Sequence, residues 1–163
     1  MIRATTTTAA VDYFSLASAA WNGGDKAQAF ELFKQGADAG DASCANNFGV
    51  FLETGAAGSI DYVQAEKYYL LAYALGDVAA ASNLAGLYIT LTKYDEARTW
   101  YDHAVEAGDG DAMVEYAELL VAGEVWGEDR IVALDLARRA TASGSITPEG
   151  NERALSLLVV LGA

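Results

Sequence analysis

Carboxylates are the side chains of this 163-residue chain whose number and spacing could do chemistry. The sequence holds 23 Asp and Glu against ten Lys and Arg, a net charge of −13. Nine acids follow one another from position 102 to position 129 with no Lys or Arg among them: Asp102, Glu106, Asp109, Asp111, Glu115, Glu118, Glu124, Glu128 and Asp129. Such a run is either a solvated face that keeps the protein soluble or a docking surface for a basic segment.

No arrangement of these groups specifies a reaction. Carboxylates can pair as acid and base, but among so many some lie close by chance, and the run lacks the spacing of a calcium loop. The only histidine, His103, excludes a two-histidine metal motif, and we expect it to be solvated or partly packed. The only cysteine, Cys44, excludes an intrachain disulfide and is predicted to be a small buried apolar residue. We therefore predict no catalytic residue, no cofactor and no metal, and an enzyme remains a remote alternative.

The net charge also indicates which class of partner the chain could bind. A net charge of −13 disfavours nucleic acid and anionic membranes and favours a basic protein, whose approach would be accelerated by long-range attraction. No apolar stretch approaches the ~20 residues that cross a bilayer. Met1–Ala10 is not followed by the apolar region of a signal peptide. On these grounds we expect a cytoplasmic protein.

A sequence repeat divides the chain into similar segments and sets the positions of the residues discussed above. Gly40, Gly76, Gly108 and Gly144 end four similar segments and are spaced by 36, 32 and 36 residues. At each we predict a helix C-terminus that needs a residue with positive φ. The Asp or Ser that follows each glycine is predicted to help cap the next helix.

Residues at fixed distances from these glycines alternate between small and large. Eleven positions before each glycine the residue is small, namely Ala29, Ala65, Ala97 and Ala133, and four positions before it is again small, namely Gly36, Ala72, Ala104 and Ala140. Eight positions before it the residue is large, namely Leu32, Tyr68, Trp100 and Leu136. Seven positions before it stand Phe33, Tyr69, Tyr101 and Ala137. A matching first helix follows the first three glycines, with Phe48, Leu84 and Tyr116 eight positions on and Gly49, Ala85 and Ala117 nine positions on. This spacing predicts an amphipathic helix hairpin that is repeated four times.

These hairpins resemble a known family. Ala97–Gly108 resembles the second helix of a Sel1-like repeat, and Asn83–Tyr88 resembles its first helix. The loops Gly55–Asp61 and Gly123–Asp129 have the longer form of that family, whereas repeats 1 and 3 turn tightly, as ordinary tetratricopeptide repeats do. The resemblance covers roughly residues 10–145 and implies an all-α fold.

We therefore predict an α-solenoid of about four antiparallel helix hairpins with a C-terminal capping helix. The helix predicted from Glu152 to Leu161 would cover the face that the last hairpin leaves open. Alternatively it forms a dimer contact, so the chain is expected to be a monomer or a weak dimer. The predicted divisions are an N-terminal extension at 1–9, repeats at 10–41, 42–77, 78–109 and 110–145, and the capping segment at 146–163.

The resemblance further implies that the first helices line a concave face on which a partner binds. The candidate residues are Phe14, Ser18, Trp21 and Asn22 in repeat 1; Ser43, Asn46, Val50 and Glu53 in repeat 2; Ser82, Gly86, Ile89 and Thr90 in repeat 3; and Asp111, Val114, Glu115, Glu118 and Val121 in repeat 4. None is Lys or Arg, so the basic clamp with which some relatives hold peptide C-termini is absent. Trp21 either faces this groove or packs inside the first hairpin.

The leading functional hypothesis is a non-enzymatic protein-protein interaction module. Its partner would be a protein or peptide with a basic segment, held in the concave groove, with an apolar anchor near Phe14 or Trp21. The alternative is a bacterial immunity or inhibitor protein that neutralises a basic toxin, because a small acidic protein suits that task.

Overall fold

The computed structural model describes residues 11–163, so the predicted extension at 1–9 lies outside the described residues. The described part is helical, and its one β-type contact is an isolated bridge between Asp109 and Ser145. The helices are α1 (Tyr13–Asn22), α2 (Lys26–Asp38), α3 (Ala42–Thr54), α4 (Tyr62–Ala74), α5 (Ala79–Thr90), α6 (Tyr94–Glu106), α7 (Gly110–Ala122), α8 (Arg130–Ala142) and α9 (Pro148–Leu161).

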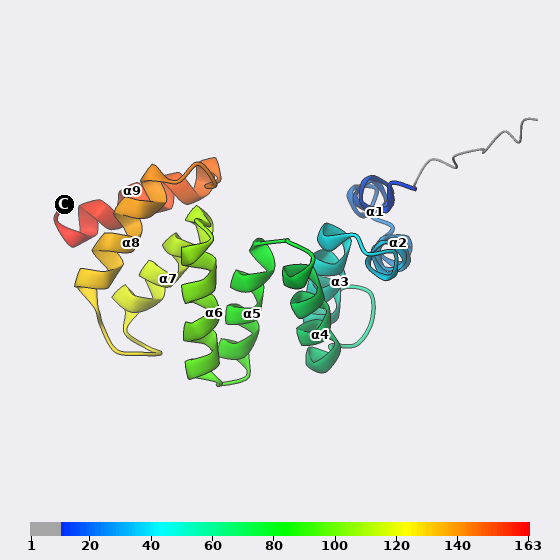
Figure 1. The fold of residues 1–163 in the computed structure, drawn as a ribbon, viewed down its shortest axis with the longest axis horizontal. Coiled ribbons are helices and arrows are strands. Elements are labelled where there is room, and N and C mark those ends of the chain that lie inside the picture. Colours follow the sequence, from blue (N-terminus) through cyan, green and yellow to red (C-terminus); the bar gives the residue numbers. More distant parts are fainter. Residues whose placement is uncertain (1–10) are drawn as a thin grey trace, which may run out of the picture.

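The helices form four consecutive hairpins, which confirms the predicted α-solenoid. Each of the pairs α1/α2, α3/α4, α5/α6 and α7/α8 packs closely together, and each hairpin packs on the next through α2 and α3, α4 and α5, and α6 and α7. The hairpins follow one another along the long axis of the molecule, and α9 lies across the last one (Figure 1). It contacts both α7 and α8, as expected of a helix that covers the end of a solenoid.

Aspartates begin most of the helices. A carboxylate at the N-cap accepts a hydrogen bond of 2.9–3.1 Å from the backbone N–H three residues on, which satisfies a donor that has no partner inside the helix. The N-cap residues are Asp12, Asp25, Asp41, Asp61, Asp109 and Asp129. Many of the acids that set the net charge therefore have a local structural role.

The predicted glycine turns occur at three of the four positions. Gly40, Gly76 and Gly108 have φ values of 88°, 99° and 82°. The prediction is wrong at Gly144, because α8 ends instead on Ser143 in an extended conformation with φ −71° and ψ 140°.

The extended chain after α8 pairs with the turn that precedes α7. The Ser143 hydroxyl donates to the Gly108 carbonyl at 2.7 Å, and the Gly110 N–H donates to the Ser145 carbonyl at 2.7 Å. Thr147, not Ser145, then caps α9, which starts at Pro148 and so earlier than the predicted Glu152. This path carries the chain across the last hairpin.

Small residues let the helices approach each other. Ala29, Ala65, Ala97 and Ala133 are all fully buried. At Gly49, an added Cβ would lie 2.6 Å from ring atoms of Tyr69, so the ring packs directly on the backbone of α3. The core therefore consists of aromatic and aliphatic side chains that fill the grooves opened by alanine and glycine.

The predictions for the environments of Cys44 and His103 are also met. Cys44 is fully buried, and burial raises the pKa of its thiol to about 12. His103 is partly exposed and packs beside Trp100, with ring centroids 5.2 Å apart.

The register of the repeat can be tested at Ala97. Ala97→Leu is expected to overpack the contact between α5 and α6 and to destabilise the fold by about 1–3 kcal/mol. Denaturant unfolding followed by circular dichroism measures this change. Ala74→Leu, at an exposed position of α4, is the control and is expected to change the midpoint little. Equal midpoints for the two variants would contradict the packing described here.

Candidate functional site

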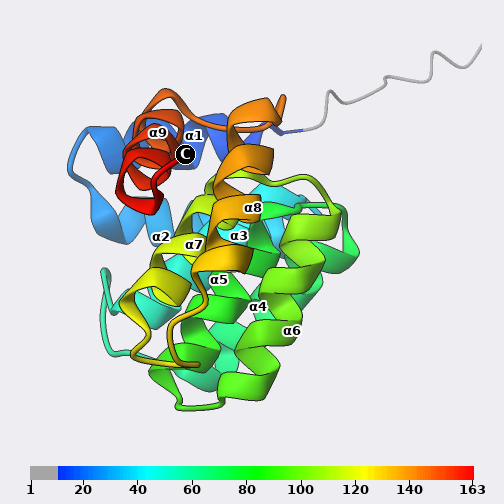
Figure 2. The same cartoon turned by 90° about the vertical axis from the view of Figure 1, so that its left-hand side faces the viewer.

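The first helices of the repeats lie next to each other and form one face of the molecule. α1 contacts α3, and α3 contacts α5. In Figure 2, which looks along the solenoid, α7 lies on the opposite side from α6. At the two ends of the solenoid, α1 and α2 at one end and α9 at the other rise on the same side of the middle helices (Figure 1). The surface formed by α1, α3 and α5 is the one that the family resemblance predicts to be concave, and it is called the concave face below.

A pocket of about 340 Å³ opens on this face between α1 and α3. Its lining residues are Ser18, Trp21, Asn22, Phe33, Asn47, Val50, Phe51, Thr54 and Ala56. Four of them, Ser18, Trp21, Asn22 and Val50, are predicted site residues that the fold brings together from two repeats. The pocket has aromatic and aliphatic walls and a rim of amides and hydroxyls.

Trp21 packs against the next repeat rather than inside its own hairpin. Its ring meets Phe51 of α3 edge-on, with centroids 5.1 Å apart and an interplanar angle of 71°. The residue nevertheless remains 43% exposed, and Lys26 Nζ lies 5.5 Å from the ring centroid. Phe14 is 39% exposed but does not line the pocket. Of the two proposed anchors, only Trp21 lines the pocket.

Hydrogen bonds hold the amides in the middle of the face. Asn83 Nδ2 donates to Asn46 Oδ1 at 2.7 Å, a bond that joins α5 to α3. Asn46 is only 8% exposed, so its predicted contact with a partner is corrected to a structural bond between repeats. Asn47 Nδ2 donates to the Ser43 carbonyl at 2.8 Å. Sequence reasoning missed Asn47, although its position three residues before Val50 could have indicated it.

The candidates further along the face have mixed roles. Glu53 accepts a hydrogen bond of 2.6 Å from the Tyr69 hydroxyl, and Ile89 is partly buried against the core. The Ser82 and Thr90 hydroxyls donate to carbonyls of their own helix. A Cβ added at Gly86 would meet no atom within 4 Å. The surface beside Gly86 is therefore free of neighbouring atoms.

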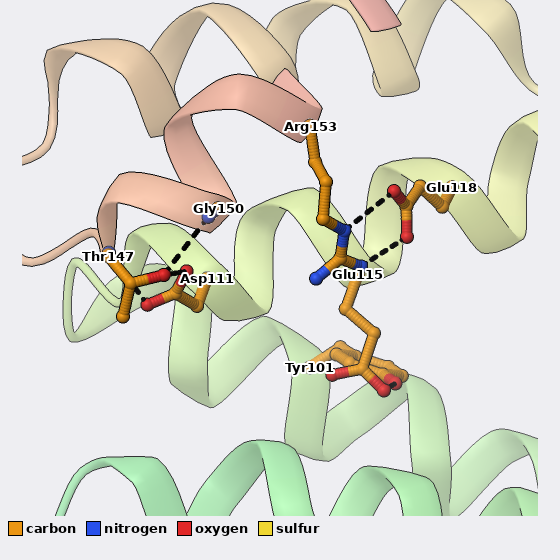
Figure 3. Close-up of polar contacts among 7 residues, drawn as sticks. All are labelled: Tyr101, Asp111, Glu115, Glu118, Thr147, Gly150 and Arg153. Carbon is orange, nitrogen blue, oxygen red and sulfur yellow. Dashed lines mark hydrogen bonds and ion pairs between the residues drawn. The ribbon is translucent and has the colours of Figure 1, made fainter. Parts of the chain in front are cut away.

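The candidates of repeat 4 are buried or make contacts within the molecule. Val114 is fully buried in the core that α7 shares with α8 and α9, which corrects its assignment to the groove. Arg153 of α9 donates through Nε to Glu118 Oε1 at 3.0 Å and forms a second bond through Nη2 to Oε2 (Figure 3). Glu115 accepts a bond of 2.8 Å from the Tyr101 hydroxyl. A base therefore does reach this face, from a helix that was predicted to be a cap or a dimer contact.

Asp111, the remaining acid of this row, is also occupied. Its two carboxylate oxygens accept the Thr147 N–H at 3.0 Å and the Thr147 hydroxyl at 2.7 Å (Figure 3). Val121, the last candidate, is partly buried against the same core. No feature of the sequence indicates the pairing of Asp111 with Thr147 or of Glu118 with Arg153, because the partners lie 36 and 35 residues apart.

Burial raises the pKa of acidic side chains that lie between the helices. It raises the pKa of Glu115, while the Tyr101 hydroxyl and the positive charge of Arg153 partly oppose this effect. Burial likewise raises the pKa of Asp77 and of Asp109, against the hydrogen bonds that they accept at helix starts. Each group is therefore harder to ionise in the fold than in the unfolded chain.

Other site types have no support among residues 11–163. No cluster of three or more His, Cys, Asp or Glu side chains is arranged to hold a metal ion in this part of the chain. None of the helices from α1 to α9 has the length and hydropathy needed to span a membrane.

Comparison with known proteins identifies the fold. No family model matches the chain, and no curated protein matches it significantly. A solved Sel1 repeat protein from Oxalobacter formigenes is similar, with a TM-score of 0.72 and 19% identity over 89% of this chain and 68% of that one. The chain thus has an α-solenoid fold similar to that of this Sel1 repeat protein.

A second solved structure has the same architecture. It is a protective antigen present in uropathogenic Escherichia coli strains, described as displaying an SLR fold. The TM-score is 0.71 with 20% identity, and the match covers 93% of this chain but 34% of the antigen. The chain therefore spans about a third of that structure. Both comparisons support the predicted family resemblance at the level of the fold.

The buried acids predict how stability depends on pH. Because the pKa values of Asp77, Asp109 and Glu115 are raised in the fold, the folded chain binds more protons than the unfolded chain near these values. Stability should therefore fall as pH rises from the ordinary pKa of these groups through their raised values. We expect a lower thermal midpoint at about pH 7 than at about pH 4, near the ordinary pKa of Asp and Glu.

A matched pair of variants separates this effect from general charge repulsion. Glu115→Gln removes the buried acid and should make the pH dependence of the thermal midpoint shallower. Glu124→Gln removes one exposed acid and should leave the dependence close to that of the unaltered chain. Parallel curves for the two variants would show that burial of Glu115 is not the cause.

Proposed function

We propose that the chain is a non-enzymatic protein-interaction module that holds a segment of a partner protein on the face formed by α1, α3 and α5. The pocket between α1 and α3 is the observation that carries this proposal. It combines the half-exposed Trp21 and Val50 with polar side chains that can meet a peptide backbone. The repeat fold supports the proposal, because solenoids present extended concave surfaces of this kind.

The pocket defines the chemistry of the segment. An apolar side chain of the partner fills the space bounded by Trp21, Val50 and Phe51, where burial excludes water. The rim residues Ser18 and Asn22 offer hydrogen bonds to the main chain beside that anchor. Large side chains seated in desolvated pockets of this kind dominate the affinity of many protein interfaces.

Residues flanking the anchor are proposed to be basic. The net charge of −13 attracts such a segment over a long range and repels acidic competitors. Because α9 covers much of the acidic row on α7, exposed acids such as Asp102, Glu106 and Glu124 contribute most of this steering. Steering acts on the association rate and is screened by salt.

The proposal is tested with variants of the pocket and a partner captured from native lysate. Trp21→Ala is expected to weaken binding by about 2 kcal/mol or more, mainly through faster dissociation, because the anchor loses its aromatic wall. Val50→Asp should have a similar effect, since it places a charge inside the pocket. Binding kinetics at two salt concentrations measure both effects.

The control for Val50→Asp is Val63→Asp, at a position of α4 that is 75% exposed and outside the pocket. Val63→Asp should bind the partner as the unaltered chain does. Salt should slow association and leave dissociation nearly unchanged. A partner that binds both pocket variants as tightly as Val63→Asp contacts some other surface, and the proposal would then be wrong.

A further inference from the structure

Helix α3 supplies acceptor oxygens to the pocket between α1 and α3. Asn47 and Thr54 both line this pocket. Asn47 Nδ2 donates to the Ser43 carbonyl at 2.8 Å, and this bond fixes which end of the amide is the nitrogen. The Thr54 hydroxyl donates its only proton to the Val50 carbonyl at 2.7 Å. No hydrogen bond within residues 11–163 uses Asn47 Oδ1. This oxygen is therefore available to a donor on a ligand.

The other walls of the pocket are aromatic. They are formed by Trp21 of α1, Phe33 of α2 and Phe51 of α3. Phe33 and Phe51 are only 3% and 5% exposed, and their ring centroids lie 5.6 Å apart. The volume of about 340 Å³ lies near the lower end of the range in which proteins bind small molecules, roughly 300–1,000 Å³. The space therefore suits one side chain that carries a ring.

The pocket contains no group that would compensate a charge. None of its lining residues is Asp, Glu, Lys or Arg. A positive charge lies beside it, because Lys26 Nζ is 5.5 Å from the centroid of the Trp21 ring. An unpaired charge is costly to remove from water, and Lys26 would also repel a cation. The anchor is therefore neutral, and the basic residues of the partner lie outside the pocket.

We propose that the anchor is a tryptophan side chain, whose indole N–H donates to Asn47 Oδ1 while its ring packs on Trp21 and Phe51. Indole combines an aromatic ring with a donor and brings no acceptor of its own. Phenylalanine would take water away from Asn47 Oδ1 without replacing its hydrogen bond. Tyrosine would add an acceptor oxygen to a wall that already presents acceptors. The inference rests on the proposed function for the use of this pocket.

Two isomers of one small molecule test the assignment on the full chain without a natural partner. 3-Methylindole is the side chain of tryptophan, and 1-methylindole has the same atoms but no N–H. Titration followed by heteronuclear NMR gives an affinity for each isomer, and the signals of Trp21 and Val50 report binding in the pocket. We expect 3-methylindole to bind about threefold to tenfold more tightly, as one neutral hydrogen bond allows.

A pair of variants assigns the acceptor. Asn47→Ala removes it and should bring the two isomers to equal affinity. Asn151→Ala makes the same substitution on α9, outside the pocket, and should preserve the preference for 3-methylindole. A preference that survives in Asn47→Ala would overturn the assignment.

The isomer comparison in the unaltered chain decides the matter even if Asn47→Ala fails to fold. Equal affinity for the two isomers would overturn the inference. So would an absence of binding up to the solubility of 3-methylindole, or signal changes confined to another surface.

The two proposals fail separately. Suppose that Trp21→Ala loses the captured partner while the two isomers bind the unaltered chain equally. The pocket then remains the site of the partner, and tryptophan is rejected as its anchor. Suppose instead that the preference for 3-methylindole depends on Asn47 while Trp21→Ala binds the partner normally. The pocket then recognises indole, and the proposed function is wrong for that partner.

Discussion

The distance at which neighbouring helices can pack is the constraint on which this structure depends. That distance is set by residues with little or no side chain, above all the fully buried Ala29, Ala65, Ala97 and Ala133. Their partners are rings such as Tyr69, which lies directly on the backbone at Gly49. A larger residue at any of these points would separate two helices and shift every hairpin that follows. The curvature of the solenoid, and with it the concave face, is therefore a consequence of where alanine and glycine stand.

The candidate site is a place where this packing is incomplete. Between α1 and α3 the facing side chains leave a pocket of about 340 Å³, and Trp21 covers only part of the opening. At the other end α9 packs on α7 and α8 and donates hydrogen bonds to the carboxylates of Asp111 and Glu118. The two ends of one face thus differ in a simple way: one is open and apolar, and the other is polar and occupied. The open, apolar end is the one on which the proposed binding mode rests.

The sequence predicts the fold well because a repeat reveals itself through recurrence. Small and large residues return at the same distance from Gly40, Gly76 and Gly108, so the pairing of helices follows without knowledge of distant contacts. The fourth turn deviates because α8 ends on Ser143, which bonds the Gly108 carbonyl rather than forming a glycine cap.

The candidate site is predicted only in part. Ser18, Trp21, Asn22 and Val50 line the pocket because a helical register assigns them to one face. The register also assigns Val114 to that face, yet the side chain is buried, because α8 and α9 complete a core around it. The partners of Asp111 and Glu118 lie outside the repeat, where periodicity carries no information.

The central claim is that a partner lies along α1, α3 and α5 and not on the opposite face. Site-specific photocrosslinking tests this most directly, with a crosslinking side chain placed at Ser18, Asn47 or Gly86 on the concave face and at Val63 or Ile131 elsewhere on the surface. Gly86 has open space around it, and Val63 and Ile131 are 75% and 84% exposed, so all three accept the probe. Crosslinks to the partner from the first three positions and none from the last two are the predicted result. Crosslinks from Val63 or Ile131, with none from the concave positions, would contradict it.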